Sequence, residues 1–388
     1  MHRLCPECNL LLVRNLKFMK DIRTDSIKTI EKKIIPFKVK HPAILKSDKK
    51  IEVLIVPKGL NPNKNQKNVA IVWDEHSIFN ILSSAYNCVV ITEIKSENDL
   101  KQLAIRKPDL VFSGVKYFTF NERIIWLNDY LETHGISYIA SGREALEYEH
   151  DKSRAKEIMQ KADIKTADFF TTEPGEYPDQ ESLPVKFPLF VKPVTGGDSR
   201  GIDFKSVVHD FKSFEAKVLD IKMKQKSTSL VETFLSGKEY SVGILQDSFS
   251  GTLNAMPVEI MVDKNINGHC ILDFDIKKND EEVVIAVTDK EIFNQLCNLA
   301  KKSFVALGGK SLGRIDIKMN HLNEPHFIEA NLMPGLSKGY FFRSCFLNLN
   351  MSYEEMILLI AKNGIASSKA PIVSKESILE VVESVSLN

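Results

Sequence analysis

Short hydrophobic runs alternate with amphipathic stretches in the part of the chain that begins near residue 50. Each run has the length of a buried strand, and each intervening stretch has the apolar spacing of a helix. Strands are predicted at residues 51–56, 68–73, 88–91, 109–112 and 136–139. Helices are predicted at residues 78–85, 97–105 and 122–134. Strands that alternate with helices indicate an open α/β sheet.

The pattern changes after residue 145, where strands dominate. A helix at 144–162 precedes a strand at 187–194, a glycine-rich loop at 195–201 and a second strand at 202–208. Two strands around a glycine-rich tip predict a hairpin. Further strands are predicted at 229–232, 240–245, 255–262, 282–287, 313–319 and 325–330. Further helices are predicted at 211–224, 290–307 and 353–362. This part is therefore expected to be α+β.

Length and composition indicate several domains. The chain has 388 residues, 43% of them hydrophobic and 27% charged, which is ordinary for folded proteins. Domains usually contain about 100–200 residues. We therefore expect an N-terminal extension (1–49), an α/β domain (50–145), two α+β subdomains (146–240 and 241–364) and a tail (365–388).

The charge balance argues against a nucleic-acid or membrane partner. Lys and Arg number 52 and Asp and Glu number 51, so the formal charge is +1 and no general basic field exists. No apolar run reaches the ~18 residues of a membrane span. The six cysteines lack the regular spacing of a disulfide framework, so a cytoplasmic location is expected.

Cys5 and Cys8 form half of a zinc-ribbon pattern. The next cysteine is Cys88, and neither His2 nor His41 has ligand spacing. A structural metal ion and two free thiols both remain open, and the missing second half favours free thiols.

Arg314, Asp316, Glu329 and Asn331 form the strongest candidate site. The first two lie on one predicted strand and the others at the end of the next, across a turn. Residues two positions apart share a strand face, so all four are expected to meet. Carboxylate and amide oxygens suit a hard cation such as Mg²⁺. The alternative is a surface hairpin with solvated charges, which the apolar neighbours disfavour.

Lys192 and the loop at 196–201 form a second candidate. A lysine within an apolar strand is costly unless an anion pairs with it, and glycine-rich backbone N–H groups can bind phosphate. An ordinary turn beside a snorkelling lysine explains the pattern equally well. Residues 231–240 could form an adenine pocket with Glu239 at the ribose, although a structural turn is favoured when this segment is taken alone.

Two other motifs are excluded. Residues 197–201 match the spacing of a hydrolase nucleophile elbow, but a strand pattern follows where that motif needs a helix. Residues 309–311 resemble the end of a P-loop, but Phe304 occupies the position of the required first glycine.

Together these segments resemble the ATP-grasp ligases, and within them the D-alanine–D-alanine ligase-like branch. The resemblance spans about residues 51–345 and follows the family's order. Its motifs are at 135–142, Asp151-Lys152, 187–201, 231–242, 313–316 and 329–335. The resemblance implies a fold in which two α+β subdomains clasp ATP behind an N-terminal α/β domain.

The resemblance also implies residue roles. The ATP phosphates would be neutralised by Lys152 and Lys192. The loop over the triphosphate would contain Gly197, Asp198, Ser199 and Gly201. The adenine pocket would contain Glu232, Thr233, Phe234 and Leu235, with Glu239 at the ribose. Two Mg²⁺ ions, or Mn²⁺ in their place, would be held by Asp316, Glu329 and Asn331. The catalytic residues would be Arg314 at the tetrahedral intermediate, Lys277 near the phosphate, and Ser199.

The implied enzyme is an ATP-dependent carboxylate–amine ligase. A carboxylate attacks the γ-phosphorus, an amine attacks the resulting acylphosphate, and ADP and phosphate are released. Positioning and charge neutralisation do this work, so no protein nucleophile is needed. The expected partners are a small-molecule carboxylate and amine, with a second copy of the chain as in dimers of the family.

The chain departs from the family at its amino-acid positions. Residues 73–78 lack the glycine pair that precedes the substrate-binding acid, and Asp74 or Glu75 is the remaining candidate. Asp198 replaces a serine, Thr233 replaces a lysine, and 336–340 replaces a Ser/His segment. We therefore expect substrates other than D-alanine. The alternatives are an authentic D-alanine–D-alanine ligase and a non-catalytic nucleotide-binding module that uses residues 1–48 to engage a partner.

Overall fold

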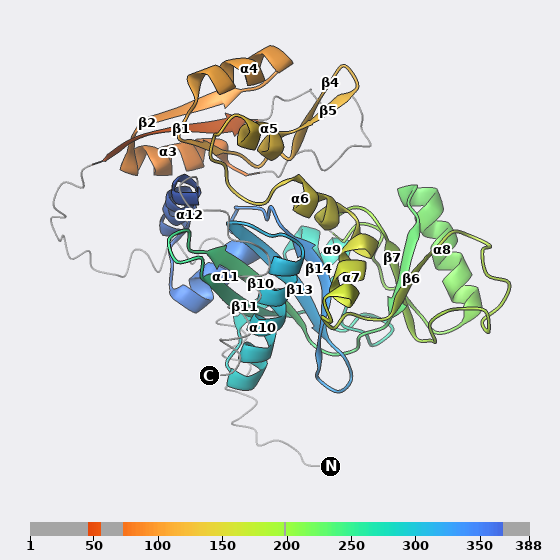
Figure 1. The fold of residues 1–388 in the computed structure, drawn as a ribbon. Helices are drawn as coiled ribbons and strands as arrows, with labels where there is room; N and C mark the ends of the chain where they lie inside the picture. The colour runs from red at the N-terminus through yellow and green to blue at the C-terminus, as the bar shows by residue number, and fades with distance from the viewer. Residues whose placement is uncertain (1–45, 56–72, 198, 368–388) are drawn as a thin grey trace. The chain divides into compact units, whose positions relative to one another are not determined.

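The computed structural model describes residues 46–55, 73–197 and 199–367 (Figure 1). These residues belong to one compact unit that begins at Lys46. Cys5, Cys8, Asp198, the tail beyond Ser367 and the strand predicted at 68–73, apart from Trp73, lie outside the described residues. Within the described ranges, no helix has both the length and the apolar character to span a bilayer.

A parallel sheet forms the N-terminal part, as predicted. It contains β1 (Ser47–Ile55), β2 (Tyr86–Glu93) and β3 (Leu110–Phe112) in the order β2-β1-β3. The helices α3 (Glu75–Ala85) and α4 (Glu97–Arg106) precede β2 and β3. The Asp74 carboxylate is the N-cap of α3, where it accepts the Ser77 N–H at 3.0 Å.

The helix predicted at 122–134 is wrong in its first part. A hairpin of β4 (Tyr117–Phe120) and β5 (Arg123–Trp126) comes first, and the helix α5 covers only Leu127–Thr133. Asn121 and Glu122 both have positive φ, the conformation of a two-residue hairpin turn whose twist matches the strands. The β-branched Ile124 and Ile125 then favour a strand.

Two further predictions near residue 140 need correction. The helix predicted at 144–162 is two helices, α6 (Arg143–His150) and α7 (Lys152–Lys161). Asp151 breaks it with extended backbone, because its carboxylate accepts the N–H groups of Ser153 and Arg154 and so starts a new helix. The strand predicted at 136–139 makes only one bridge, between Tyr138 and Val111.

A four-stranded antiparallel sheet follows, with α8 (Phe211–Gln225) packed against it (Figure 1). Its order is β6 (Phe169–Thr172), β9 (Ser229–Thr233), β7 (Leu189–Pro193) and β8 (Val207–Val208). The predicted hairpin forms, but its second strand shrinks to β8 because turns closed by hydrogen bonds occupy 199–202 and 203–206. The strand β6 was not predicted.

The C-terminal part contains a five-stranded antiparallel sheet. Its order is β12 (Val283–Ala286), β11 (Leu253–Met261), β10 (Glu239–Gln246), β13 (Leu312–Met319) and β14 (Pro325–Asn331). Its helices are α9 (Phe274–Asn279), α10 (Lys290–Ala306), α11 (Tyr340–Leu349) and α12 (Tyr353–Ser367). The predicted strands and the helices α10 and α12 are confirmed, whereas α9 and α11 were not predicted.

Two glycines allow α10 and α11 to pack closely on opposite faces of this sheet. Gly243 approaches Ser344 of α11, and Gly313 approaches Phe304 of α10. Gly243 pairs with Arg314, and Gly313 is the next residue along β13, so the two glycines face opposite sides. The side chains of Arg314 and Asp316 therefore lie on the α11 face.

Gly313→Ala is expected to destabilise the fold by about 1–3 kcal/mol. An added Cβ would lie 2.6 Å from Cε2 of Phe304, whose fully buried ring cannot retreat. The measurement is urea unfolding. Gly142→Ala is the matched control, because its nearest atom is 3.8 Å away and it should leave the midpoint unchanged. Equal midpoints for the two variants would contradict the packing described here.

Candidate active site

A pocket lies where the strands of the two antiparallel sheets approach one another. It encloses about 680 Å³, part of it open to solvent, which is within the usual range for small-molecule sites of about 300–1,000 Å³. Ten residues singled out in the sequence line it: Lys192, Ser199, Glu232, Thr233, Phe234, Leu235, Glu239, Lys277, Asp316 and Glu329. Segments more than 120 residues apart in the chain thus contribute to one pocket.

The strands β13 and β14 bring the four residues of the strongest candidate together. Asp316 pairs directly with Glu329, and Arg314 pairs with Asn331, so all four side chains share one face. Arg314 donates from Nε and Nη2 to the two Asp316 oxygens at 2.9 and 2.8 Å. Ser241 of β10 donates to the same carboxylate at 2.8 Å, and Asn331 Nδ2 lies 3.4 Å from it. The predicted convergence is confirmed.

Asp316 is held as a carboxylate despite its burial. Burial alone would raise the pKa of its side chain, but the Arg314 guanidinium outweighs burial and keeps this pKa below its ordinary value. Lys277 and the Ser241 hydroxyl act in the same direction. The Tyr340 ring covers this pair, with its centroid 5.3 Å from Cζ of Arg314. The site therefore presents negative oxygens next to a fixed guanidinium.

The donor set fits a hard divalent cation. Asp316 and Glu329 supply carboxylates and Asn331 supplies an amide oxygen, and such oxygens are the ligands that Mg²⁺ prefers. Glu329 is partly exposed, and the ammonium nearest to it is Lys152 Nζ at 3.8 Å. No nitrogen or sulfur ligand accompanies them. Only two of these three side chains are carboxylates, and nowhere in the described part of the chain, this site included, do three His, Cys, Asp or Glu side chains gather in a metal-binding group.

Lys192 belongs to a buried charge cluster with Glu232 and Lys156. Lys192 Nζ lies 2.7 Å from one Glu232 oxygen, and Lys156 Nζ lies 2.9 Å from the other. Both lysines are about 1% exposed. Burial raises the pKa of Glu232, but the two ammonium groups lower it to about 2, so its carboxylate stays charged. Two cations and one anion leave one buried positive charge, which is costly until an anion binds.

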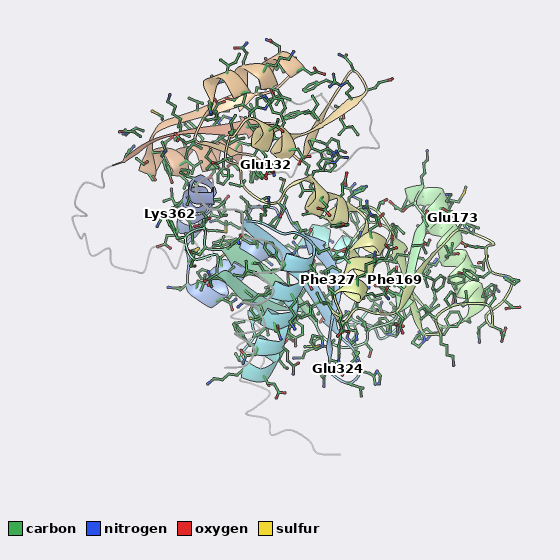
Figure 2. The ribbon with its side chains drawn as sticks, viewed as in Figure 1. Glu132, Phe169, Glu173, Glu324, Phe327 and Lys362 are labelled. Atoms are coloured by element: carbon green, nitrogen blue, oxygen red, sulfur yellow. The ribbon has the colours of Figure 1, made fainter. Side chains whose placement is uncertain are left out.

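Sequence reasoning missed Lys156. Besides its pairing with Glu232, the Lys156 ammonium donates to the Thr166 hydroxyl at 2.6 Å and lies 5.5 Å from the centre of the Phe169 ring. Residues 165 and 166 run beside Phe327 of β14, and Figure 2 labels Phe327 and Phe169. Lys156 is one helical turn after Lys152 in α7. This i,i+4 spacing was the available signal, because it places both ammonium groups on one helix face.

Lys152 lies next to both the glycine-rich loop and Glu329 of β14 without lining the pocket. Its Nζ donates to the Gly196 carbonyl at 2.6 Å and lies 3.8 Å from Glu329. Burial lowers its pKa, and Glu329 opposes this effect. The structure therefore places Lys152 behind the pocket lining, next to Glu329 and the glycine-rich loop.

The loop residues are only partly brought together. Ser199 lines the pocket and donates to the Leu272 carbonyl at 3.0 Å. Gly201 has φ +79°, and a Cβ there would lie 2.7 Å from Pro193, so this position needs glycine. Neither Gly197 nor Gly201 lines the pocket. Arg314 and Asn331 contact Asp316 from just outside it.

The predicted adenine and ribose residues all line the pocket. The N–H groups of Thr233 and Phe234 are hydrogen-bonded to the carbonyls of Asp168 and Pro188. Glu239 is paired with Lys318 at 2.9 Å. Six lining residues were not predicted, since nothing but ordinary strand composition marks them: Phe190, Ile202, Ile271, Leu272, Lys318 and Ile328.

Comparisons with known proteins identify the family of this chain. The family model described as "D-ala D-ala ligase C-terminus" matches residues 158–361, slightly more than half of the chain. The D-alanine–D-alanine ligase of Actinobacillus pleuropneumoniae serotype 5b (strain L20) is 27% identical over 229 residues, 58% of this chain and 72% of that protein. The ligase of Acetivibrio thermocellus is 29% identical over 298 residues, 74% of each chain.

Solved structures show the same fold. The D-alanine–D-alanine ligase of Bacillus anthracis, solved in complex with ATP, superposes with a TM-score of 0.60 at 18% identity and covers 83% of this chain and 99% of its own. The ligase of Coxiella burnetii gives a TM-score of 0.58 at 14% identity, over 88% of this chain and 100% of its own. The chain therefore belongs to the D-alanine–D-alanine ligase family of ATP-grasp enzymes, which are ATP-dependent ligases that join a carboxylate to an amine.

Proposed function

We propose that this ligase activates a carboxylate other than that of D-alanine and couples it to an amine, with ATP and Mg²⁺ bound in the pocket described above. The observation that carries the proposal is the convergence of the predicted ATP residues on one pocket. The amino-acid positions, by contrast, hold different residues.

The chain's own residues account for the chemistry that this reaction needs. The buried positive charge of Lys156, Lys192 and Glu232 attracts the ATP phosphates, and Lys152 and Lys277 add to it. Asp316, Glu329 and Asn331 would hold Mg²⁺, which supplies further charge neutralisation. The Arg314 guanidinium stabilises the oxyanion that forms when the amine attacks the acyl carbon. Ser199 holds the loop against the Leu272 carbonyl and so shields the phosphates from water.

Tyr340 supports an unusual second substrate. In the resembling family, the segment after Pro334-Gly335 contacts the second substrate's carboxylate through Ser or His. Here the Tyr340 hydroxyl donates to Oε1 of the buried Glu282 at 2.5 Å, while Oε2 of Glu282 has no hydrogen-bond partner. The ring also covers Lys277 and Arg314. The Glu282 carboxylate repels a substrate carboxylate and favours an amine or hydroxyl group beside it.

Four expectations stay predictions: the domain boundaries at 49, 145, 240 and 364, a homodimer, a cytoplasmic location, and the absence of nucleic-acid and membrane partners. Light scattering of the purified chain measures the oligomeric state directly.

A phosphate-release screen over carboxylates and amines, singly and in pairs, tests the substrates. We expect release to require ATP, Mg²⁺ and a carboxylate–amine pair, with ADP formed in equal amount. D-Alanine alone should give background release. Efficient turnover of D-alanine alone would identify an authentic D-alanine–D-alanine ligase and overturn the substrate proposal.

Asp316→Asn is expected to lower kcat at least about 100-fold, because it removes the anion that fixes Arg314 and contributes to the cation site. Asp220→Asn is the matched control, since Asp220 pairs with Lys224 on the outside of α8 and should keep full activity. Turnover that survives Asp316→Asn would count against the proposed catalytic role, and cellular function without turnover would favour the binding module.

Lys192→Met should weaken ATP binding at least about 30-fold, equivalent to about 2 kcal/mol. The substitution leaves Glu232 paired with Lys156 alone and removes the cluster's excess positive charge. Titration calorimetry with a non-hydrolysable ATP analogue measures the effect. Lys222→Met removes an exposed lysine that pairs with Glu173 and should leave the affinity unchanged. If Lys192→Met bound the ATP analogue as tightly as Lys222→Met, a role of Lys192 in phosphate binding would be excluded.

A further inference from the structure

Glu149, near the end of α6, accepts hydrogen bonds from the backbone that follows β14, the strand of Glu329 and Asn331. Its Oε2 accepts the N–H groups of Leu332 and Met333 at 2.8 and 3.0 Å. Its Oε1 accepts from Lys116 Nζ at 2.6 Å. The side chains of Glu149 and Lys116 are only 10% and 11% exposed. One nearly buried carboxylate therefore joins the segment before β4 to the segment after β14.

The residues that Glu149 holds come directly after Asn331, the last residue of β14. A strand end frays unless the following backbone is fixed. Leu332 is fixed on both sides, because its carbonyl also accepts the Ser141 N–H at 3.3 Å. The backbone directly after Asn331 is thus held by groups more than 180 residues away in the chain.

The same short segment also places Lys152. Asp151, two residues after Glu149, caps α7, and Lys152 begins that helix with its Nζ 3.8 Å from Glu329. Glu149 therefore holds the backbone next to Asn331, while its neighbours place the Lys152 ammonium beside Glu329. Neither Glu149 nor Lys116 lines the nucleotide pocket, so their effect passes through other groups.

We propose that Glu149 and its partner Lys116 are positioning residues that orient Asn331 for the divalent cation of the nucleotide complex. The inference rests on the proposed function of the Asp316, Glu329 and Asn331 set. The charge of Glu149 matters because a carboxylate accepts backbone N–H groups more strongly than a neutral oxygen does. Lys116 matters because it compensates that charge in a nearly dry site. Partners of this kind typically change metal affinity 10- to 100-fold.

The test measures metal binding instead of turnover. ADP affinity is titrated by calorimetry with and without Mn²⁺, using the full chain and the variants Glu149→Gln and Lys116→Met. We expect the Mn²⁺-dependent gain in ADP affinity to fall about tenfold in both variants. ADP affinity without metal should not change, because the pocket lining is intact.

Two controls separate positioning from general stability. Glu147→Gln makes the same substitution in α6, where Glu147 pairs with the exposed Arg143, and should bind like the wild type. Lys116→Arg keeps the cation and should retain most of the Mn²⁺-dependent gain. The comparison of Lys116→Met with Lys116→Arg still tests the positioning role if Glu149→Gln does not fold.

The possible results are distinct. A lower melting temperature with an unchanged Mn²⁺-dependent gain would overturn the inference and leave Glu149 as a structural residue. An equal loss in Lys116→Arg and Lys116→Met would overturn the role of the lysine charge. If Mn²⁺ did not change the ADP affinity of the wild-type chain, this result would instead contradict the proposed function of the cation site.

Discussion

The antiparallel register of β13 and β14 is the constraint on which the site depends. It pairs Asp316 with Glu329 and Arg314 with Asn331, and a shift of one residue would turn one member of each pair to the other face. The buried Ile315 and Ala330 pair directly and hold this register, and a register shift between Asp316 and Ile317 separates it from the Ile317–Phe327 pair. Packing of apolar side chains on the α10 face therefore determines which polar groups meet on the α11 face.

A second constraint is electrostatic. Glu232 pairs with both Lys156 and Lys192 and holds them in place, although burial lowers the pKa of Lys156 and the three charges do not balance. Replacing such a cluster with apolar residues often stabilises a protein, so its presence here points to a ligand and not to stability. The excess positive charge lies beside the oxygen-rich face of β13 and β14. Under the proposed function, a nucleotide anion would offset the excess positive charge of this cluster.

Local sequence patterns predicted most of the strands and the four residues on β13 and β14, because a period of two along a strand fixes which side chains share a face. They failed where a tertiary contact or a turn decides the structure. Two positive-φ residues convert part of a predicted helix into the β4–β5 hairpin, and the Asp151 cap divides another helix. Lys156 was missed because its one signal, the i,i+4 spacing from Lys152, was not used, and Glu149 because its partners Lys116 and Leu332 lie far away in the chain.

The fork of two hydrogen bonds from Arg314 to Asp316 has a thermodynamic consequence. Both oxygens of this carboxylate are engaged, so a cation that uses Asp316 must share it with the guanidinium. In the proposed cation site, ion occupancy and the freedom of Arg314 would therefore be linked, and by reciprocity whatever draws Arg314 away would also tighten the hold on the ion. Charge that builds up on a reacting acyl group would pull in that direction, so the ion would be bound most firmly while the bond is being made.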